Sequence, residues 1–515
     1  MKNNYLITTP IYYVNARPHL GHIYTTLLCD VMNEYQKLSG KNSFFLTGVD
    51  EHGDKIVKAA DLENSTPQEY VNKISGIFEE TWKSLKISND DFIRTTQERH
   101  KKVVQHVLNK LYEKGDIYLS EYEGTYCLGC ERYLTEKELN EDGNCPDHLV
   151  KPEIIKESNY FFKLQKYLPI WEKILENNPD LVKPEQYFKE ISGTIQELKK
   201  LGEDLSISRP VKRLTWGIPI PFDKNYVTYV WFDALLNYIS ALDFPDGEKF
   251  KNYWPQARHV IAKDILKPHG IYWPTMLLAA DIEIFQNLFV HGYWLGLNDV
   301  KMSKSLQNAV NPVDLINVIG LDSFRYFLMR EMTFGSDSKF SESTLENRIN
   351  QDLANNLGNL IQRTLSMIKK YTDGNIPEKV TNPENEVLDE IIRFSVIRFN
   401  DFMNTFQFSK ALESIFVIID KLNKLIEENK PWEMAKKNPS LVPGFLRMLL
   451  DGISIVMLNL RPFLRVKFQQ YSSITGLHSE INFPLNSNEI KYNVQLPESW
   501  DILFPRIILT ENEVS

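Results

Sequence analysis

The first fifty residues alternate between short apolar runs and one long helical pattern, and this order constrains the fold more than any other feature. Residues 6–9 form an apolar run, residues 23–38 carry apolar side chains at helical spacing, and residues 43–53 (SFFLTGVDEHG) supply a second run. Strand, loop, helix and strand in this order predict an α/β fold with a doubly wound parallel sheet. Ligands bind such sheets beyond the carboxyl ends of the strands, where we expect the loop around His19, and Asp50, to lie.

The loop before the helical pattern contains two histidines, His19 and His22, in the sequence PHLGH. If the segment opens a helix, a spacing of three places both imidazoles on one side. Gly21 has no side chain, so a ligand could approach the backbone closely. A helix N-terminus also presents N–H groups and the positive end of the helix dipole. The stretch therefore predicts an anion site, with a phosphate as its natural occupant.

The chain has 515 residues, too many for one compact core, so two to four domains are expected. Apolar runs resume at residues 226–239, 257–270 and 287–297, as if strands completed the sheet. The expected domains are the first half of the sheet domain (1–115), an insertion (116–225), the second half of the sheet domain (226–295), a lysine-containing region (296–345) and an α-helical domain (346–515).

The pattern after about residue 345 is almost entirely helical. Residues 415, 419, 422 and 426 are all isoleucine or leucine and form one stripe at helical spacing. An all-α helix bundle is therefore expected to follow the sheet.

Three of the four cysteines are clustered with a histidine in the insertion. Cys127 and Cys130 have the CxxC spacing, and Cys145 and His148 repeat it. Two such pairs are typical of a structural zinc knuckle, in which three thiolates and an imidazole close a tetrahedron. Cys29 lies on the apolar stripe of the first helix, where core packing is the simpler interpretation.

A second basic segment, NDVKMSKSLQN, lies nearly three hundred residues after the histidines. Lys301 and Lys304 supply ammonium groups, and Ser303 and Ser305 supply hydroxyls. Such donors suit the oxygens of a polyphosphate as charge builds in a transition state.

The net charge of −9 disfavours non-specific binding to DNA or to anionic membranes, although a local basic patch could still contact RNA. We expect no signal peptide and no membrane span. Clustered cysteines with metal-ligand spacing indicate a reducing compartment, and a cytoplasmic location follows.

The two basic motifs together resemble the paired signatures of the class I aminoacyl-tRNA synthetases. PHLGH is similar to the H-x-G-H signature of that class, and KMSKS is its second signature. The segments TTPIYYVN, TGVDEHG, YVWFDALLNY and KDILKPHGIYWP, with the zinc knuckle, narrow the resemblance to the methionyl-tRNA synthetases of the bacterial and organellar type. The resemblance implies a Rossmann-like catalytic domain split by the knuckle insertion.

The resemblance also implies the residues that act on ATP. His19 and His22 would contact the phosphates, and Lys304, with Lys301, would neutralise departing pyrophosphate. The catalytic set is thus His19, His22, Lys301 and Lys304, and the ATP-binding set is His19, Gly21, His22, Lys263, Asp264 and Lys304.

The methionine site follows from the same resemblance. Asp50 would accept the substrate ammonium, and Arg209 occupies a position on the active-site face of the insertion. Aromatic and apolar side chains suit a polarisable thioether. The expected pocket consists of Ile11, Tyr13, Asp50, Trp231, Ala234, Leu235, Tyr238, Ile265, His269 and Trp273.

In the helical domain, NLIQR resembles the segment that reads the anticodon in this family. It implies that Asn359 and Arg363 contact bases and that Trp432 stacks on one. Guanidinium and aromatic groups are what single-stranded RNA loops require.

The match departs from the family pattern at three positions. Ala262 replaces a usual glycine, Pro268 replaces an aromatic residue, and Gln307 replaces a common glycine after KMSKS. The first two affect the expected shape of the pocket, and Gln307 bears on the freedom of its loop.

The predicted reaction is activation of methionine by Mg²⁺-bound ATP, followed by transfer to the terminal ribose of tRNA(Met). No side-chain nucleophile is needed, because alignment and charge stabilisation suffice. A monomer is expected, since the chain ends soon after the helical domain. The alternatives are a synthetase for another amino acid, and a non-catalytic tRNA-binding scaffold.

Overall fold

The computed structural model describes residues 3–127, 132–134, 138–146, 149–296, 312–380, 383–478, 483–492 and 495–509. The contacts within the chain divide it into two units. The first comprises residues 1–18 and 42–291, and the second comprises residues 19–41 and 292–515.

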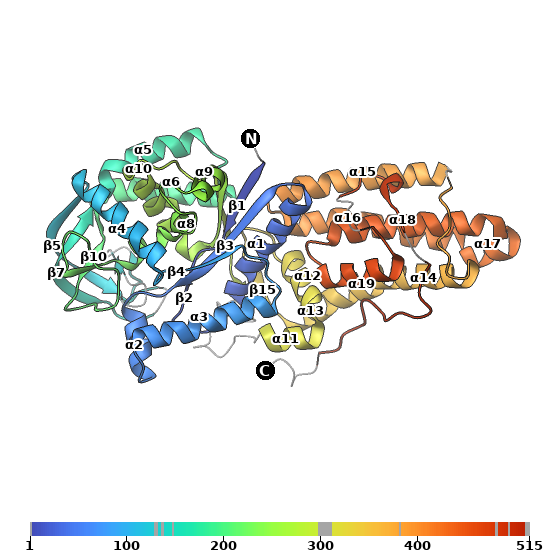
Figure 1. Cartoon of the computed structure of the whole chain (residues 1–515), viewed down its shortest axis with the longest axis horizontal. Helices are drawn as coiled ribbons and strands as arrows, with labels where there is room; N and C mark the ends of the chain where they lie inside the picture. Colours follow the sequence, from blue (N-terminus) through green and yellow to red (C-terminus); the bar gives the residue numbers. More distant parts are fainter. Residues whose placement is uncertain are drawn as a thin grey trace. The chain divides into compact units, whose positions relative to one another are not determined.

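The first unit is built on a parallel sheet, which confirms the predicted fold class (Figure 1). Its strands follow the order β2-β3-β1-β12-β13-β8, and β4 also pairs with β3. Every pairing is parallel. The strands are β1 (Asn4–Thr8), β2 (Tyr12–Tyr13), β3 (Asn42–Asp50), β4 (Asp91–Arg94), β8 (Val182–Lys183), β12 (Ala257–Ala262) and β13 (Asn287–His291).

The sheet strands are buried along most of their length, as expected for a parallel sheet covered by helices. The helices and helical turns of this unit are α2 (Asp54–Leu62), α3 (Pro67–Ser84), α4 (Glu98–Glu113), α5 (Leu164–Asn177), α6 (Glu185–Leu201), α7 (Val230–Leu235), α8 (Asn237–Ser240), α9 (Glu248–Tyr253), η2 (Trp254–Gln256), η3 (Lys263–Ile265), the π-helical η4 (Pro268–Tyr272) and α10 (Trp273–Ala279).

One of the predicted strands is wrong. Residues 226–239 contain a short strand only at their start, and the rest forms α7 and α8. The reason is that a continuous apolar run has no period that separates a buried helix from a buried strand. The runs at 257–270 and 287–297 do begin with sheet strands, β12 and β13.

The segment expected to be an insertion contains an antiparallel sheet of order β6-β5-β7-β9 and a hairpin of β10 and β11. Its strand β8 joins the parallel sheet beside β13. The strands are β5 (Ile117–Cys127), β6 (Arg132–Leu134), β7 (Glu153–Phe162), β9 (Leu205–Ser206), β10 (Ser208–Pro210) and β11 (Tyr226–Thr228).

The second unit is mainly helical, and it includes the first long helix of the chain, α1 (Leu20–Leu38). The remaining elements are β14 (Trp294–Leu295), α11 (Pro312–Ile319), α12 (Leu321–Glu331), β15 (Ser338–Lys339), α13 (Glu342–Arg348), the π-helical η6 (Ile349–Gly358), α14 (Asn359–Tyr371), α15 (Pro383–Asn404), α16 (Phe408–Asn429), α17 (Pro431–Lys437), η7 (Pro439–Leu441), α18 (Val442–Leu460), α19 (Arg465–Thr475) and η8 (Ser487–Glu489).

Helix α18 is the core helix of this unit and packs against α14, α15 and α16 (Figure 1). Among the described residues, its extended segment Pro439–Leu460 is the one helix long and apolar enough to cross a membrane, yet 78% of its apolar window is buried. Burial by neighbouring helices accounts for its composition. The predicted stripe on α16, residues 415, 419, 422 and 426, is also fully buried.

Helix α1 is held in its unit by a buried ion pair. Arg325 of α12 places Nη1 2.7 Å from Oδ2 of Asp30, and Arg465 of α19 approaches the same oxygen at 3.4 Å. The neighbouring Cys29 is fully buried, which confirms its predicted place in the core.

Candidate active site

The two histidines of PHLGH close the N-terminus of α1. His19 is the N-cap residue, and its Nδ1 accepts a hydrogen bond from the backbone N–H of Gly21 at 3.1 Å. The backbone N–H of His19 in turn donates to Nδ1 of His22 at 3.4 Å. The segment therefore opens a helix, and the histidines form a reciprocal capping box.

These hydrogen bonds fix the tautomer of both rings. An Nδ1 that accepts a hydrogen bond carries no proton, so each imidazole is neutral and carries its proton on Nε2. The rings stack with their centroids 3.7 Å apart. The first turn of α1 thus has two neighbouring Nε2–H donors beside the positive end of the helix dipole.

Gly21 leaves room for the His19 ring. A Cβ at Gly21 would lie 3.0 Å from Cε1 and 3.2 Å from Nδ1 of His19. The missing side chain lets the imidazole fold back over the helix terminus.

Asp50 is the last residue of β3 and is buried, at the carboxyl end of a parallel strand. Its Oδ1 accepts the backbone N–H of His52 at 3.5 Å, and its carbonyl oxygen accepts the N–H of Val14 at 3.2 Å. Tyr13 on β2 pairs with Asp50 in the sheet. The backbone of Asp50 is therefore held in the sheet, and its carboxylate is contacted by the backbone of the loop that follows.

Glu51, next to Asp50, has a structural part. Its carboxylate accepts Nε of Arg94 at 2.8 Å and is completely buried. Its carbonyl oxygen accepts the indole N–H of Trp216 at 2.6 Å. Glu51 thereby anchors the loop that follows β3.

A buried network that sequence reasoning missed lies beside this loop. The carboxylate of Asp233 on α7 accepts hydrogen bonds from Nδ1 of His52, at 2.7 Å, and from Nε2 of His100, at 2.6 Å. Burial alone would raise the pKa of Asp233, but the charge of His52 and the hydrogen bonds from both imidazoles hold the pKa below its ordinary range. These residues are far apart in sequence, and His100 and Asp233 fit no metal or nucleophile spacing that could have drawn attention to them.

Four of the predicted methionine-site residues meet in one aromatic cluster. The hydroxyl of Tyr238 lies 2.8 Å from Nε2 of His269. The centroid of the Tyr238 ring is 5.8 Å from that of Trp273, and the His269 ring lies 6.3 Å from Trp231. Of the other predicted residues, Leu235 is buried in the core around this cluster, Ile11 and Ile265 pack against that core, and Ala234 is buried on α7.

His269 is held in one neutral form. Its Nδ1 lies 2.9 Å from the carbonyl oxygen of Ile265, which can only accept, so Nδ1 carries the proton and Nε2 accepts from Tyr238. Burial lowers the pKa of His269 to about 4. The aromatic part of the expected pocket is therefore uncharged at neutral pH.

A second buried imidazole, that of His259, contacts this aromatic cluster. His259 on β12 contacts Thr8 Oγ1 through Nδ1 at 2.8 Å and accepts the indole N–H of Trp273 at 3.2 Å. Burial lowers the pKa of His259 well below its ordinary value.

The predicted ATP residues Lys263 and Asp264 follow β12 directly, in the turn η3. The departure at Ala262 is accommodated in ordinary extended backbone, and Pro268 is the first residue of η4 and follows helical residues.

Only part of the predicted zinc knuckle lies within the described residues. Cys127 at the end of β5 and Cys145 are both buried in one small cluster with Leu134. Cys130 and His148 lie outside the described residues, as do Lys301, Ser303, Lys304, Ser305 and Gln307. Within the described part of the chain, no group of three or more histidine, cysteine, aspartate or glutamate residues is arranged to hold a metal ion.

Arg209 on β10 is buried. Its Nη1 donates to the carbonyl oxygen of Ser208 at 2.7 Å, and its guanidinium lies over the ring of Tyr229 at 4.6 Å. The side chain is thus fixed within the insertion.

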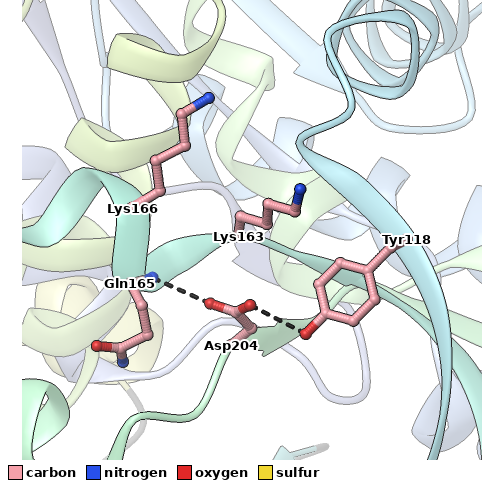
Figure 2. A pocket seen from close by; sticks show the side chains of 5 residues that line it. All are labelled: Tyr118, Lys163, Gln165, Lys166 and Asp204. Atoms are coloured by element: carbon pink, nitrogen blue, oxygen red, sulfur yellow. Dashed lines mark hydrogen bonds between the residues drawn. The ribbon is translucent and has the colours of Figure 1, made fainter.

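A hollow of about 470 Å³ in the insertion has none of the predicted site residues in its wall. Figure 2 shows its Asp204 carboxylate between the Tyr118 hydroxyl, at 2.9 Å, and the backbone N–H of Gln165, at 3.0 Å. Lys166 pairs with Asp116 at 2.5 Å. Two of its charged side chains, Asp204 and Lys166, are therefore already paired within the protein.

The predicted anticodon residues lie on two helices of the second unit. Asn359 and Arg363 are exposed, one turn apart on α14. Trp432 on α17 is 42% exposed. All three are accessible to a macromolecule.

Comparison with known proteins identifies close relatives along the whole chain. The family model described as tRNA synthetases class I (M) matches residues 5–151 and 148–365. The chain is 40% identical over 525 residues to the methionine–tRNA ligase of Fusobacterium nucleatum, covering 100% of this chain and 81% of the relative. It is 42% identical over 478 residues to that of Bacillus subtilis, covering 90% and 71%.

Solved structures of a methionyl-tRNA synthetase are also similar to this chain along nearly its whole length. Mycobacterium tuberculosis methionyl-tRNA synthetase in complex with methionyl-adenylate superposes with a TM-score of 0.92 at 33% identity, covering 98% of this chain and 100% of that one. The free form of the same enzyme gives a TM-score of 0.86 at 30% identity, with 99% of each chain covered.

Proposed function

The chain belongs to the methionyl-tRNA synthetases of class I and is a methionine–tRNA ligase, and from this premise we propose which of its residues perform each step. Membership in this family sets aside both alternatives left open by the sequence, which were a synthetase for another amino acid and a non-catalytic scaffold. In the reaction, the methionine carboxylate attacks the α-phosphorus of ATP, pyrophosphate leaves, and the terminal ribose hydroxyl of tRNA(Met) takes the methionyl group.

His19 and His22 bind the phosphates of ATP and stabilise the transition state. The observation that carries this proposal is the capping box at α1, which makes both rings neutral and places their protons on Nε2. Gly21 completes the phosphate site by allowing this arrangement. Donors fixed before the reaction stabilise developing charge without reorganising.

Lys263, Asp264, Lys301 and Lys304 complete the ATP site. Lys263 and Asp264 stand at the carboxyl end of β12, where parallel sheets bind ligands. Lys304, with Lys301, neutralises pyrophosphate as it departs with Mg²⁺; this part rests on the KMSKS sequence alone.

Asp50 accepts the ammonium group of methionine, a charge-assisted contact that a buried and oriented carboxylate favours. The thioether lies among the aromatic side chains around Tyr238 and Trp273. A neutral His269 suits this pocket, because a charged imidazolium would need solvation that an apolar side chain cannot give. The complete proposed pocket is Ile11, Tyr13, Asp50, Trp231, Ala234, Leu235, Tyr238, Ile265, His269 and Trp273.

The residues of the knuckle fit a structural zinc ion. Cys127 and Cys145 come together in a buried cluster, which brings two thiols from separate CxxC-like pairs to one place. With Cys130 and His148 they would supply four protein ligands, and zinc so held would stabilise the fold of the insertion without entering the reaction.

Asn359, Arg363 and Trp432 read the anticodon of tRNA(Met), for which their exposure on α14 and α17 is suited. We also propose that the enzyme acts as a monomer in the cytoplasm, where the reducing conditions keep the knuckle thiols available to metal.

The assignment of the phosphate site is tested by ATP–pyrophosphate exchange with each amino acid in turn, followed by charging of tRNA(Met). We expect exchange with methionine alone, and loss of exchange in Lys304→Ala without a matching loss of methionine affinity. Unchanged exchange in that variant would contradict the role given to the lysine loop.

A further inference from the structure

We propose that Asp233 is a positioning residue for the ammonium site: it holds His52, and through His52 the Asp50 carboxylate, in place against the helix that carries the methionine pocket. The inference rests on the proposed role of Asp50 as the ammonium acceptor.

Both carboxylate oxygens of Asp233 accept a hydrogen bond. Oδ2 lies 2.7 Å from Nδ1 of His52, and Oδ1 lies 2.6 Å from Nε2 of His100. An ionised carboxylate can only accept, so each imidazole donates to it. Asp233 and His100 are completely buried and His52 is 4% exposed, so water does not compete for these hydrogen bonds.

The network ends on the backbone of the first unit. Nδ1 of His100 lies 3.1 Å from Oγ of Ser240, which donates to the carbonyl oxygen of Leu236 at 2.7 Å. The position of the Asp233 carboxylate is therefore fixed by α4 and α8 as well as by its own helix, α7.

His52 transmits this position to Asp50. The backbone N–H of His52 donates to Oδ1 of Asp50 at 3.5 Å. Trp216 holds the backbone on both sides of His52: its indole donates to the Glu51 carbonyl oxygen at 2.6 Å, and its carbonyl oxygen accepts the N–H of Gly53 at 3.3 Å. Asp233 holds the side chain of the residue between these two contacts, so His52, whose backbone N–H reaches Asp50, is anchored at its side chain as well as at both neighbouring peptides.

Asp233 also stands between two proposed pocket residues on α7, Trp231 and Ala234. The hydrogen bond between Asp233 and His52 thus connects the proposed site for the ammonium group to the proposed pocket for the methionine side chain. Since a buried charged pair is often no more stable than apolar packing, a charged network at this position is better explained by geometry than by stability.

The test compares ligands that do and do not carry an ammonium group. In Asp233→Asn, the amide presents N–H to one of the two imidazoles and cannot hold both. We expect KM for methionine in ATP–pyrophosphate exchange to rise by about 10- to 100-fold, with KM for ATP within about twofold. The inhibition constant of methioninol should rise equally, whereas that of 4-(methylthio)butanoate, which lacks the amino group, should stay unchanged.

Asp116→Asn is the matched control. Asp116 is another completely buried carboxylate of this unit, and it accepts the Tyr167 hydroxyl at 2.6 Å and Nζ of Lys166 at 2.5 Å. It should lower the melting temperature without changing KM for methionine. If Asp233→Asn does not fold, His52→Gln, which still donates to Asp233, should show the same ligand selectivity with a smaller loss.

Equal loss of both inhibitors, or no loss of either, would overturn the positioning role. Asp50→Asn separates this failure from that of the proposed function. If Asp50→Asn weakens methioninol selectively and Asp233→Asn does not, only the role of Asp233 falls. If Asp50→Asn shows no selectivity, the ammonium site itself is misassigned.

Discussion

The imidazole rings of His19 and His22 stack with their centroids 3.7 Å apart at the first turn of α1. Each ring uses Nδ1 in the helix cap and so carries its proton on Nε2. Helix capping and the proposed phosphate binding therefore depend on one arrangement. The two contributions can be separated by the choice of substitution.

His19→Asn should keep the cap and lose the phosphate donor, because asparagine is a strong N-cap residue. We expect ATP–pyrophosphate exchange to fall on the order of 10²–10³-fold with little change in melting temperature. His19→Ala should lose the same activity and, in addition, about 1 kcal/mol of stability. A thermal scan and an exchange assay on both variants check this, and equal melting temperatures for the two variants would contradict the capping role.

The sequence was sufficient to predict the sheet and the helix that follows PHLGH, because both depend on short contiguous patterns. The helical spacing after residue 23, the strands around residues 6 and 46, and the buried stripe on α16 were all predicted from local periodicity. The tautomers of His19 and His22 could not be predicted, since they depend on hydrogen-bond directions that only the folded cap defines.

The buried network around Asp233 could not be predicted from the sequence either. His52 and His100 approach the same carboxylate from positions 181 and 133 residues away. No spacing rule joins residues so distant, and the apolar run around Asp233 was interpreted as a strand. Its helical geometry is what directs the carboxylate toward both imidazoles.

The buried histidines of the pocket should make stability depend on pH. A histidine in an unfolded chain has a pKa near 6.5, whereas burial lowers the pKa of His269 to about 4. Above pH 6.5 both states are neutral and the contribution is complete. As the pH falls from 6.5 to 4, the unfolded chain takes up a proton that the folded protein does not, so the free energy of unfolding falls by up to about 3 kcal/mol.

Urea unfolding of the wild type and His269→Gln between pH 4.5 and 7 measures this contribution. The free energy of unfolding of the variant should fall less steeply on acidification than that of the wild type. Some pH dependence should remain in the variant, because burial also lowers the pKa of His259. Identical slopes would show that His269 does not titrate as the geometry requires.

The ion pair of Asp30 and Arg325 should be costly to break from one side. Both side chains are buried and 2.7 Å apart, so Asp30→Asn leaves a guanidinium without its counter-charge. We expect a loss of about 3–5 kcal/mol in the free energy of unfolding. Glu63→Gln, which breaks the exposed pair with Lys73 at the same distance, should cost at most about 1 kcal/mol. Similar costs for the two variants would contradict the energetic difference between buried and exposed pairs.

The knuckle should bind one zinc ion per chain. Cys145→Ser should lose this metal, as measured by elemental analysis of the purified protein, because a serine hydroxyl is a poor ligand for zinc. Cys29→Ser is the control, since Cys29 is an equally buried cysteine on α1. Zinc retained in Cys145→Ser, or lost in Cys29→Ser, would contradict the assigned ligands.

Trp432 should matter for tRNA and not for activation. Stacking of one base on an aromatic side chain contributes about 1–3 kcal/mol, so Trp432→Ala should lower kcat/KM for tRNA(Met) by about 10- to 100-fold. Exchange of pyrophosphate, which needs no tRNA, should be unchanged. Phe394→Ala removes another aromatic side chain of the second unit, 63% exposed on α15, and should leave charging intact. A parallel fall of exchange and charging in Trp432→Ala would instead indicate damage to the fold.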